Sequence, residues 1–169
     1  MKNADNPIYL YQLLTFRNSE LYMIECIDEK DFYINENKKI LLFKTIELLK
    51  KYSIEKNIEL TVEDLAEEKI DLDMLRNWLD TTSTSINSVE FLILWNFFDD
   101  VAFSIGSVFL GSEDRYSSCY SKLFHGNNLP AINTSGKKYT PEWDKEELEK
   151  IRQVMNSGME IFEESATYY

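Results

Sequence analysis

The chain has 169 residues, and its 44% hydrophobic and 14% aromatic content is enough for a folded core in a single domain spanning residues 1–169. Thirty Asp and Glu against eighteen Lys and Arg give a formal net charge of −12. This charge repels phosphate groups, so it disfavours nucleic acids and anionic membranes as partners. It would speed encounter with a basic protein, although solubility alone is an alternative reason for an acidic surface.

The two cysteines, Cys26 and Cys119, lie far apart in the sequence, without the spacing of a disulfide framework or a zinc site. This pattern of cysteines is typical of a protein in a reducing compartment. The first residues, MKNADNPIYLYQLL, lack the basic and apolar regions of a secretory signal. We therefore expect a cytoplasmic protein.

The N-terminal part predicts a helix followed by a small sheet. Residues 1–20 carry several apolar residues after a polar start, and Pro7 suits the first turn of a short helix. Leu21–Ile27 and Lys39–Lys44 are rich in β-branched and large apolar residues, and Asn35–Asn37 is a polar turn between them. These features indicate a small antiparallel meander.

A second helix is expected to begin at the N-cap Thr45 and to continue to about Lys56. After it, apolar residues alternate as in a further strand: Ile58, Leu60 and Val62.

The densest acidic stretch runs from Glu59 to Asp73 and contains a single cation, Lys69. Asp71 or Asp73 can cap a helix whose apolar side faces the core through Leu72, Leu75, Trp78 and Leu79. The carboxylates then face outward, either as a solvated surface or as a partner-binding surface. The candidate binding residues here are Glu59, Glu63, Asp64, Glu67, Glu68, Asp71 and Asp73.

The stretch from Asn87 to Gly106 predicts the central helix, buried over about 88–105. Its apolar residues exceed one narrow stripe, so several faces must be covered by other parts of the chain. Asn87 is a good N-cap, and Gly106 is a suitable end. Its polar residues, among them Asn96, interrupt the apolar run too early for a membrane span.

Residues 108–140 are predicted to be rich in loops, with a helical turn or two at Tyr116–Phe124. Thr140 as N-cap and Pro141 at the first helical position predict a last helix that continues to about Glu164. The expected fold is therefore α+β, with a small antiparallel sheet near the N-terminus packed beside a helical body.

No catalytic motif is evident. His125 is the only histidine, and we expect it to bond nearby backbone. Asp99 and Asp100 are adjacent, so on a helix they point about 100° apart and do not face one metal together. Cys119 lacks a base at recognisable spacing. We expect no enzyme activity, no metal and no cofactor, with a carboxylate–metal hydrolase as an alternative.

The ten tyrosines are a further indication of binding, because tyrosine is a frequent anchor at protein interfaces. Tyr116 and Tyr120, like Tyr139, Tyr168 and Tyr169, are expected in loops or at the terminus. Tyr116 and Tyr120 are the candidate partner-binding residues among them. The alternative is that many of these rings cover the edge of the core with their hydroxyls in water.

A series of motifs over residues 38–164 resembles the immunity proteins of bacterial contact-dependent growth inhibition and related polymorphic toxin systems. The motifs are ILLFKTIELLKKY, IDLDMLRNWL, LWNFFDDVAFSIG, KLFHGNNLP and KYTPEWDKEELEKIRQVMNSGMEIF. The most telling positions are Trp95 and Asn96 with Asp99 and Ser104, and the segment Leu123–Pro130.

This resemblance implies a cytoplasmic protein that binds and neutralises the toxic C-terminal domain of a cognate effector, commonly a nuclease. A nuclease is basic because it holds phosphates, so an acidic partner suits it. The alternative is an acidic regulatory or interaction module without a toxin partner.

If the acidic stretch faces the toxin, reversing Glu63, Asp64, Glu67 and Glu68 to Lys should slow association about ten-fold or more, because steering acts mainly on the association rate. Stopped-flow measurements at low and high salt test this prediction. Equal rates with equal salt dependence in the variant would place the interface elsewhere.

Overall fold

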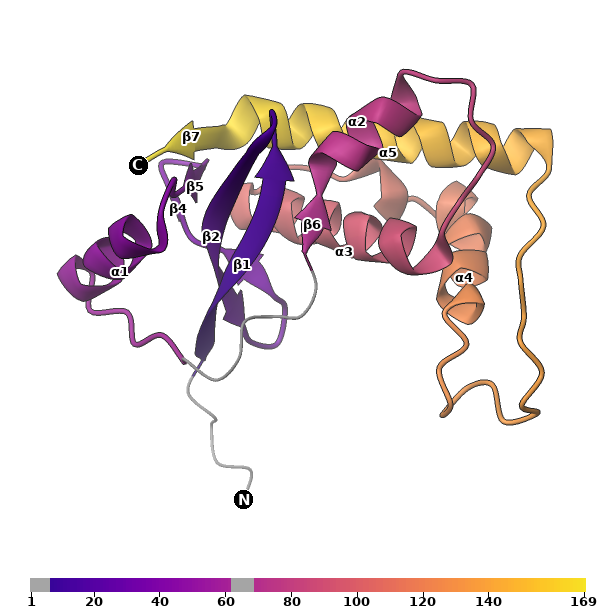
Figure 1. Ribbon diagram of the computed structural model, residues 1–169, viewed down its shortest axis with the longest axis horizontal. Helices are drawn as coiled ribbons and strands as arrows, with labels where there is room; N and C mark the ends of the chain where they lie inside the picture. The colour runs from indigo at the N-terminus through magenta and orange to yellow at the C-terminus, as the bar shows by residue number, and fades with distance from the viewer. Residues whose placement is uncertain (1–6, 62–68) are drawn as a thin grey trace.

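The computed structural model describes residues 7–61 and 69–169 and has the expected α+β fold (Figure 1). A long β-hairpin lies beside helices that run roughly across the molecule. The strands are β1 (Ile8–Phe16), β2 (Ser19–Ile27), β3 (Phe32–Tyr33), β4 (Asn35–Glu36), β5 (Lys39–Leu42), β6 (Ile70–Asp71) and β7 (Ala166–Tyr168). The α-helices are α1 (Ile46–Glu55), α2 (Leu72–Leu79), α3 (Ser88–Ile105), α4 (Ser117–Gly126) and α5 (Lys145–Ser165), with 3₁₀ turns η1 (Leu110–Ser112) and η2 (Asp114–Tyr116).

The helix predicted within residues 1–20 is wrong: this segment is strand β1. It pairs antiparallel with β2 along its whole length, from Ile8 opposite Ile27 to Phe16 opposite Ser19. The two residues between the strands, Arg17 and Asn18, both have positive φ, as a tight hairpin turn requires. The turn lacks the usual glycine, so the hairpin was not recognised from the sequence.

The strands form two sheets, in the orders β3-β2-β1-β6 and β4-β5-β7. The predicted strands at Leu21–Ile27 and Lys39–Lys44 correspond to β2 and β5. Tyr22 and Phe43 exchange two backbone hydrogen bonds of 2.9 Å, which join the sheets. The last strand, β7, follows α5 and pairs in parallel with β5. The end of α5 is thereby fixed against the N-terminal strands (Figure 1).

Helices α1 and α2 begin where the sequence indicates. The Thr45 hydroxyl accepts a hydrogen bond from the Leu48 amide at the start of α1. Asp71 accepts one from the Met74 amide at the start of α2. Beyond α1, Leu60 forms a parallel bridge with Tyr9, which partly confirms the predicted strand. Val62 lies outside the described residues.

Helix α3 is the buried central helix that its composition predicts. Asn87 caps it through the amides of Val89 and Glu90, and Gly106 ends it at a φ of 68°. Six other elements pack against it: α4, α5, β3, β5, β6 and η1. Most of its apolar side chains lie in the main core: Phe91, Leu94, Trp95, Phe97, Phe98, Val101 and Ala102.

Helix α5 begins later than predicted. Its N-cap is Asp144, not Thr140, and Asp144 forms a reciprocal capping box with Glu147. Such a box satisfies two backbone amides at once, so it outcompetes the Thr140–Pro141 start. The residues just before Asp144 are therefore not helical.

The contact between α3 and α5 is closest at Gly158. This glycine is buried in α5, and a Cβ added there would overlap the ring of Phe98, which is itself fully buried. Glycine lets the two helices approach here because it has no side chain. The position has an ordinary negative φ, so its requirement is space and not backbone conformation.

Gly158→Ala should lower the free energy of unfolding by about 1–3 kcal/mol, because the new methyl group displaces the Phe98 ring in a packed core. Helix propensity alone predicts the opposite sign, a gain of about 1 kcal/mol. Urea denaturation of both proteins measures the difference. Ser157→Ala, one residue earlier and half-exposed, is the control and should not destabilise. A stabilised Gly158→Ala protein would show that the helices are not in close contact here.

Candidate functional site

The solvent side of α3 carries a row of polar residues that ends in an exposed aromatic ring. Asn96, Asp99, Asp100 and Phe103 recur at helical spacing, so they share one side of the helix. Phe103 is 52% exposed although it belongs to the most apolar segment of the chain. This side of α3 is the part of the central helix that the fold leaves open.

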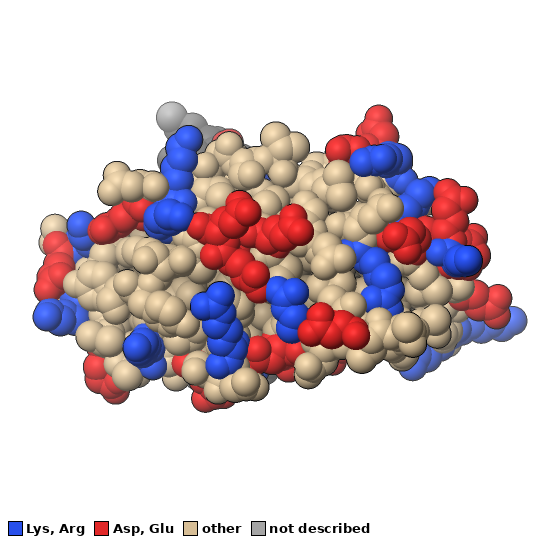
Figure 2. All heavy atoms as spheres, turned by 90° about the horizontal axis from the view of Figure 1, so that it is seen from above, with Lys and Arg blue, Asp and Glu red and all other residues tan. Residues whose placement is uncertain are grey.

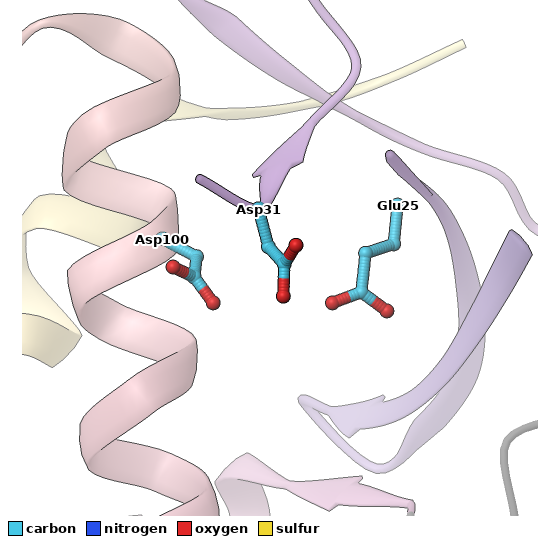
Figure 3. Close-up of side chains that lie close together, drawn as sticks. All are labelled: Glu25, Asp31 and Asp100. Carbon is cyan, nitrogen blue, oxygen red and sulfur yellow. The ribbon is translucent and has the colours of Figure 1, made fainter. Parts of the chain in front are cut away.

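A carboxylate cluster links this side of α3 to the hairpin. One carboxylate oxygen from each of Glu25, Asp31 and Asp100 lies within 4.8 Å of the others. Figure 3 shows Asp31 between the other two, with all three carboxylates directed toward a common space. The sequence indicates only the adjacent pair Asp99 and Asp100 and not this group, because Glu25 and Asp31 reach Asp100 only through the fold.

Lys30 neutralises part of this charge. Its ammonium group contacts the carboxylates of Asp99 and Asp100, the latter at 3.0 Å, and lies 5.7 Å from the centre of the Phe103 ring. Burial alone would lower the pKa of Lys30, but hydrogen bonds to both carboxylates raise it. Carboxylate oxygens are suitable ligands for hard cations. In this arrangement, however, the protein supplies a cation of its own.

The negative charge continues from Asp99 toward η1 and η2. Ser112 donates a 2.9 Å hydrogen bond to Asp99, and the next residues along the chain are Glu113 and Asp114. We call the whole group the acidic strip: Glu25, Asp28, Asp31, Asp99, Asp100, Glu113 and Asp114. In the described ranges, the ion pairs of this strip join Asp99 and Asp100 to Lys30, and Glu113 to Arg115.

One end of the acidic strip borders a hollow of about 240 Å³. Trp95 and Tyr120 contribute aromatic surface to it, with ring centres 5.7 Å apart. The Tyr120 hydroxyl donates a 3.0 Å hydrogen bond to Asn96. The residues lining this aromatic hollow are Trp95, Asn96, Asp99, Gly111, Ser112, Glu113, Asp114, Ser117 and Tyr120, with no Lys or Arg among those described.

Another hollow, of about 440 Å³, lies between α4 and the following loop and has the opposite charge character. Lys122, Lys137 and His125 line it. The His125 Nδ1 lies 2.7 Å from the Ser121 carbonyl, so this nitrogen donates to backbone, as the sequence predicts. His125 lies at the end of α4 and not in a loop. This basic hollow suits a basic partner poorly.

Two of the candidate residues in the acidic stretch accept hydrogen bonds that stabilise the fold. Asp71 caps α2 and accepts a hydrogen bond from the Thr15 hydroxyl. Asp73 accepts one from the amide of Asn18 in the hairpin turn. Glu59 is exposed. The remaining four lie outside the described residues: Glu63, Asp64, Glu67 and Glu68.

The two candidate tyrosines differ sharply. Tyr116 is only 1% exposed, and its hydroxyl donates to Gln153, so the expectation of a surface loop residue is wrong. It belongs to the main hydrophobic core. Tyr120 lies on α4 and lines the aromatic hollow, so it remains a candidate. Cys119, next to it in sequence, is fully buried.

Acidic and basic side chains both occur on the face seen from above Figure 1. Figure 2 looks onto the molecule from above Figure 1, toward α5 and α2, and acidic side chains near its middle have Lys and Arg beside them. Helix α5 takes part in ion pairs between Arg76 and Glu163 and between Lys150 and Glu146. In the described ranges, no helix has the length and apolar character needed to cross a membrane.

Comparisons with known proteins identify a similar fold but no protein family. No protein-family model matches the sequence, and no curated protein matches it. The crystal structure of the SatS C-terminal domain in complex with bromine has a similar fold, with a TM-score of 0.52 and 10% sequence identity. The match covers 97% of this chain and 93% of that chain. At this identity the likeness shows the fold alone.

Asp100 should make stability depend on pH. Burial raises its pKa to about 6, although Lys30 favours the ionised form. An unfolded Asp titrates near 3.9, so the protonated form stabilises the fold below about pH 4, and this contribution is lost as pH rises through about 6. Asp100→Asn cannot ionise, so its melting temperature should rise relative to that of the wild type between pH 4 and pH 7.

Thermal unfolding of both proteins at several pH values checks this. The difference between the two melting temperatures is the quantity to follow, because other carboxylates titrate in both proteins alike. A difference that stays constant from pH 4 to pH 7 would mean that folding does not raise the pKa of Asp100.

Proposed function

We propose that this protein is an immunity protein that binds and neutralises the basic toxic domain, a nuclease, of a contact-dependent growth inhibition effector in the cytoplasm. The observation that carries the proposal is the acidic strip with its aromatic hollow. It combines carboxylates in excess over cations with exposed or half-buried rings, which is the surface character that a basic protein partner needs.

The shape of the strip supports binding by contact over an extended surface. It runs from the β2–β3 connection across α3 to η2, so a partner would contact several elements at once. Asp28, Glu113 and Asp114 are exposed, and Phe103 adds apolar surface next to Lys30. Charged residues at such a surface increase the association rate, while buried aromatic anchors slow dissociation.

The basic surface of a nuclease is also the surface that holds its substrate. A protein that covers this surface with carboxylates competes directly with nucleic acid phosphates. Inhibition then requires no reaction by the immunity protein, only tight stoichiometric binding. This agrees with the resemblance seen in the sequence and with the net charge of −12.

The test uses the C-terminal domain encoded by the adjacent upstream gene. This domain should be retained by the immobilised protein, and co-expression should restore growth to cells that produce the toxin domain. Failure of both binding and protection would overturn the proposal and favour an acidic interaction module with a different partner.

A charge-neutralised variant locates the interface. Asp28→Asn, Glu113→Gln and Asp114→Asn together should slow association about ten-fold at low salt and flatten its salt dependence, because these carboxylates steer the encounter. The matched control removes three exposed carboxylates elsewhere, with Glu47, Glu160 and Glu164 changed to Gln. Stopped-flow rates that fall equally in both variants would show an effect of total charge and not of the strip.

A further inference from the structure

The aromatic hollow contains a hydrogen-bond donor without an acceptor. The Trp95 side chain is buried, with 3% exposure. No described residue accepts a hydrogen bond from its indole N–H. The described part of the chain has no fully buried side-chain nitrogen or oxygen lacking a partner, so this N–H reaches solvent. The nitrogen of a buried indole normally donates a hydrogen bond to a partner.

The indole nitrogen of Trp95 lies close to Gly111, and both residues line the hollow. Gly111 lines the same hollow, and a Cβ added to it would lie 2.7 Å from the Trp95 nitrogen. The same Cβ would lie 2.5 Å from the Phe109 ring, so Gly111 packs closely against both side chains and leaves no room for a side chain of its own. By contrast, the Trp78 indole N–H donates a 2.8 Å hydrogen bond to the Ser85 carbonyl.

Three acidic residues line the same hollow as this donor. Asp99, Glu113 and Asp114 line the hollow, and Asp114 takes part in none of the ion pairs between described residues. Glu113 pairs with Arg115 at 2.8 Å, but both side chains are about half exposed, so the pair is easily exchanged. The hollow thus offers both an acceptor site for a cation and a donor for a carbonyl.

The hollow is of a size that suits a single side chain. Its volume of about 240 Å³ is below the roughly 300–1,000 Å³ usual for small-molecule sites. The Trp95 and Tyr120 rings at its wall attract cations. A guanidinium group matches this setting, because its planar fork binds carboxylates and stacks on aromatic rings.

We propose that the aromatic hollow receives an arginine side chain of the toxin domain, with a backbone carbonyl of the same segment accepting a hydrogen bond from Trp95. This inference rests on the proposed function for the identity of the partner. Asp114 and Glu113 bind the guanidinium, and Tyr120 packs against it. The arginine is the central anchor of the interface, and the rest of the acidic strip guides the approach.

The chemistry of the hollow can be tested without the toxin. The probe is N-acetyl-arginine N-methylamide, which carries a guanidinium group and two amide carbonyls. In ¹⁵N-edited NMR spectra, the Trp95 indole N–H resonance should shift with saturable dependence on the probe. The Trp78 indole resonance should stay in place, because its N–H is already bonded to Ser85.

Two controls separate the guanidinium from nonspecific contact. N-acetyl-citrulline N-methylamide has nearly the same shape without the charge and should bind at least about ten-fold more weakly. Glu113→Gln with Asp114→Asn should weaken binding of the arginine probe by a similar factor, whereas Glu47→Gln with Glu160→Gln should not. An unmoved Trp95 resonance, or equal binding of the two probes, would overturn the proposal.

The same variants distinguish a failure of this inference from a failure of the proposed function. If the toxin domain binds and is inhibited equally by the wild type and by the Glu113→Gln, Asp114→Asn protein, the function stands and the arginine anchor is wrong. If the arginine probe binds as expected but the toxin domain does not, the hollow is a guanidinium-binding site and the proposed partner is wrong.

Discussion

The close approach of α3 and α5 at Gly158 and Phe98 is the contact on which the rest of the structure depends. Helix α3 is too apolar to expose more than a narrow side, and α5 is the longest element able to cover it. Their approach also positions Phe162 against Phe97 and Phe16, which connects the helices to the hairpin. Gly158, which has no side chain, thus sets the distance between α3 and α5 in the core.

This packing determines which side of α3 remains for binding. With α5, α4 and the strands occupying its other sides, Asp99 and Phe103 face outward, and Asp100 lies partly buried beside them. The β2–β3 connection brings Asp31 and Lys30 to that side, and η1 brings Ser112. The acidic strip is therefore a product of tertiary structure. Its members come from three separate parts of the sequence, and none of these parts predicts the strip by itself.

The sequence predicted elements whose signals are local, and missed those that depend on distant partners. The N-cap Asn87 and the end at Gly106 lie within the segment they define, so α3 was predicted almost to the residue. For strand β1 the sequence predicts a helix, because pairing with β2 decides its conformation and the turn at Arg17 and Asn18 contains no glycine. Of the candidate binding residues, Tyr120 reaches the aromatic hollow, whereas Tyr116 is buried by contacts with α5 that no local pattern indicates.

The pairing of β7 with β5 has a consequence for how the chain acquires its fold during synthesis. Ile40 lies opposite Ala166, so β5 emerges from the ribosome long before its neighbour exists. Contacts this distant in sequence slow folding, because a long loop must close before they form. Until α5 and β7 have been made, the apolar sides of α3 and one edge of β5 lack their cover. The nascent chain should therefore be a substrate for chaperones up to its last helix, and its native state should form in one late step.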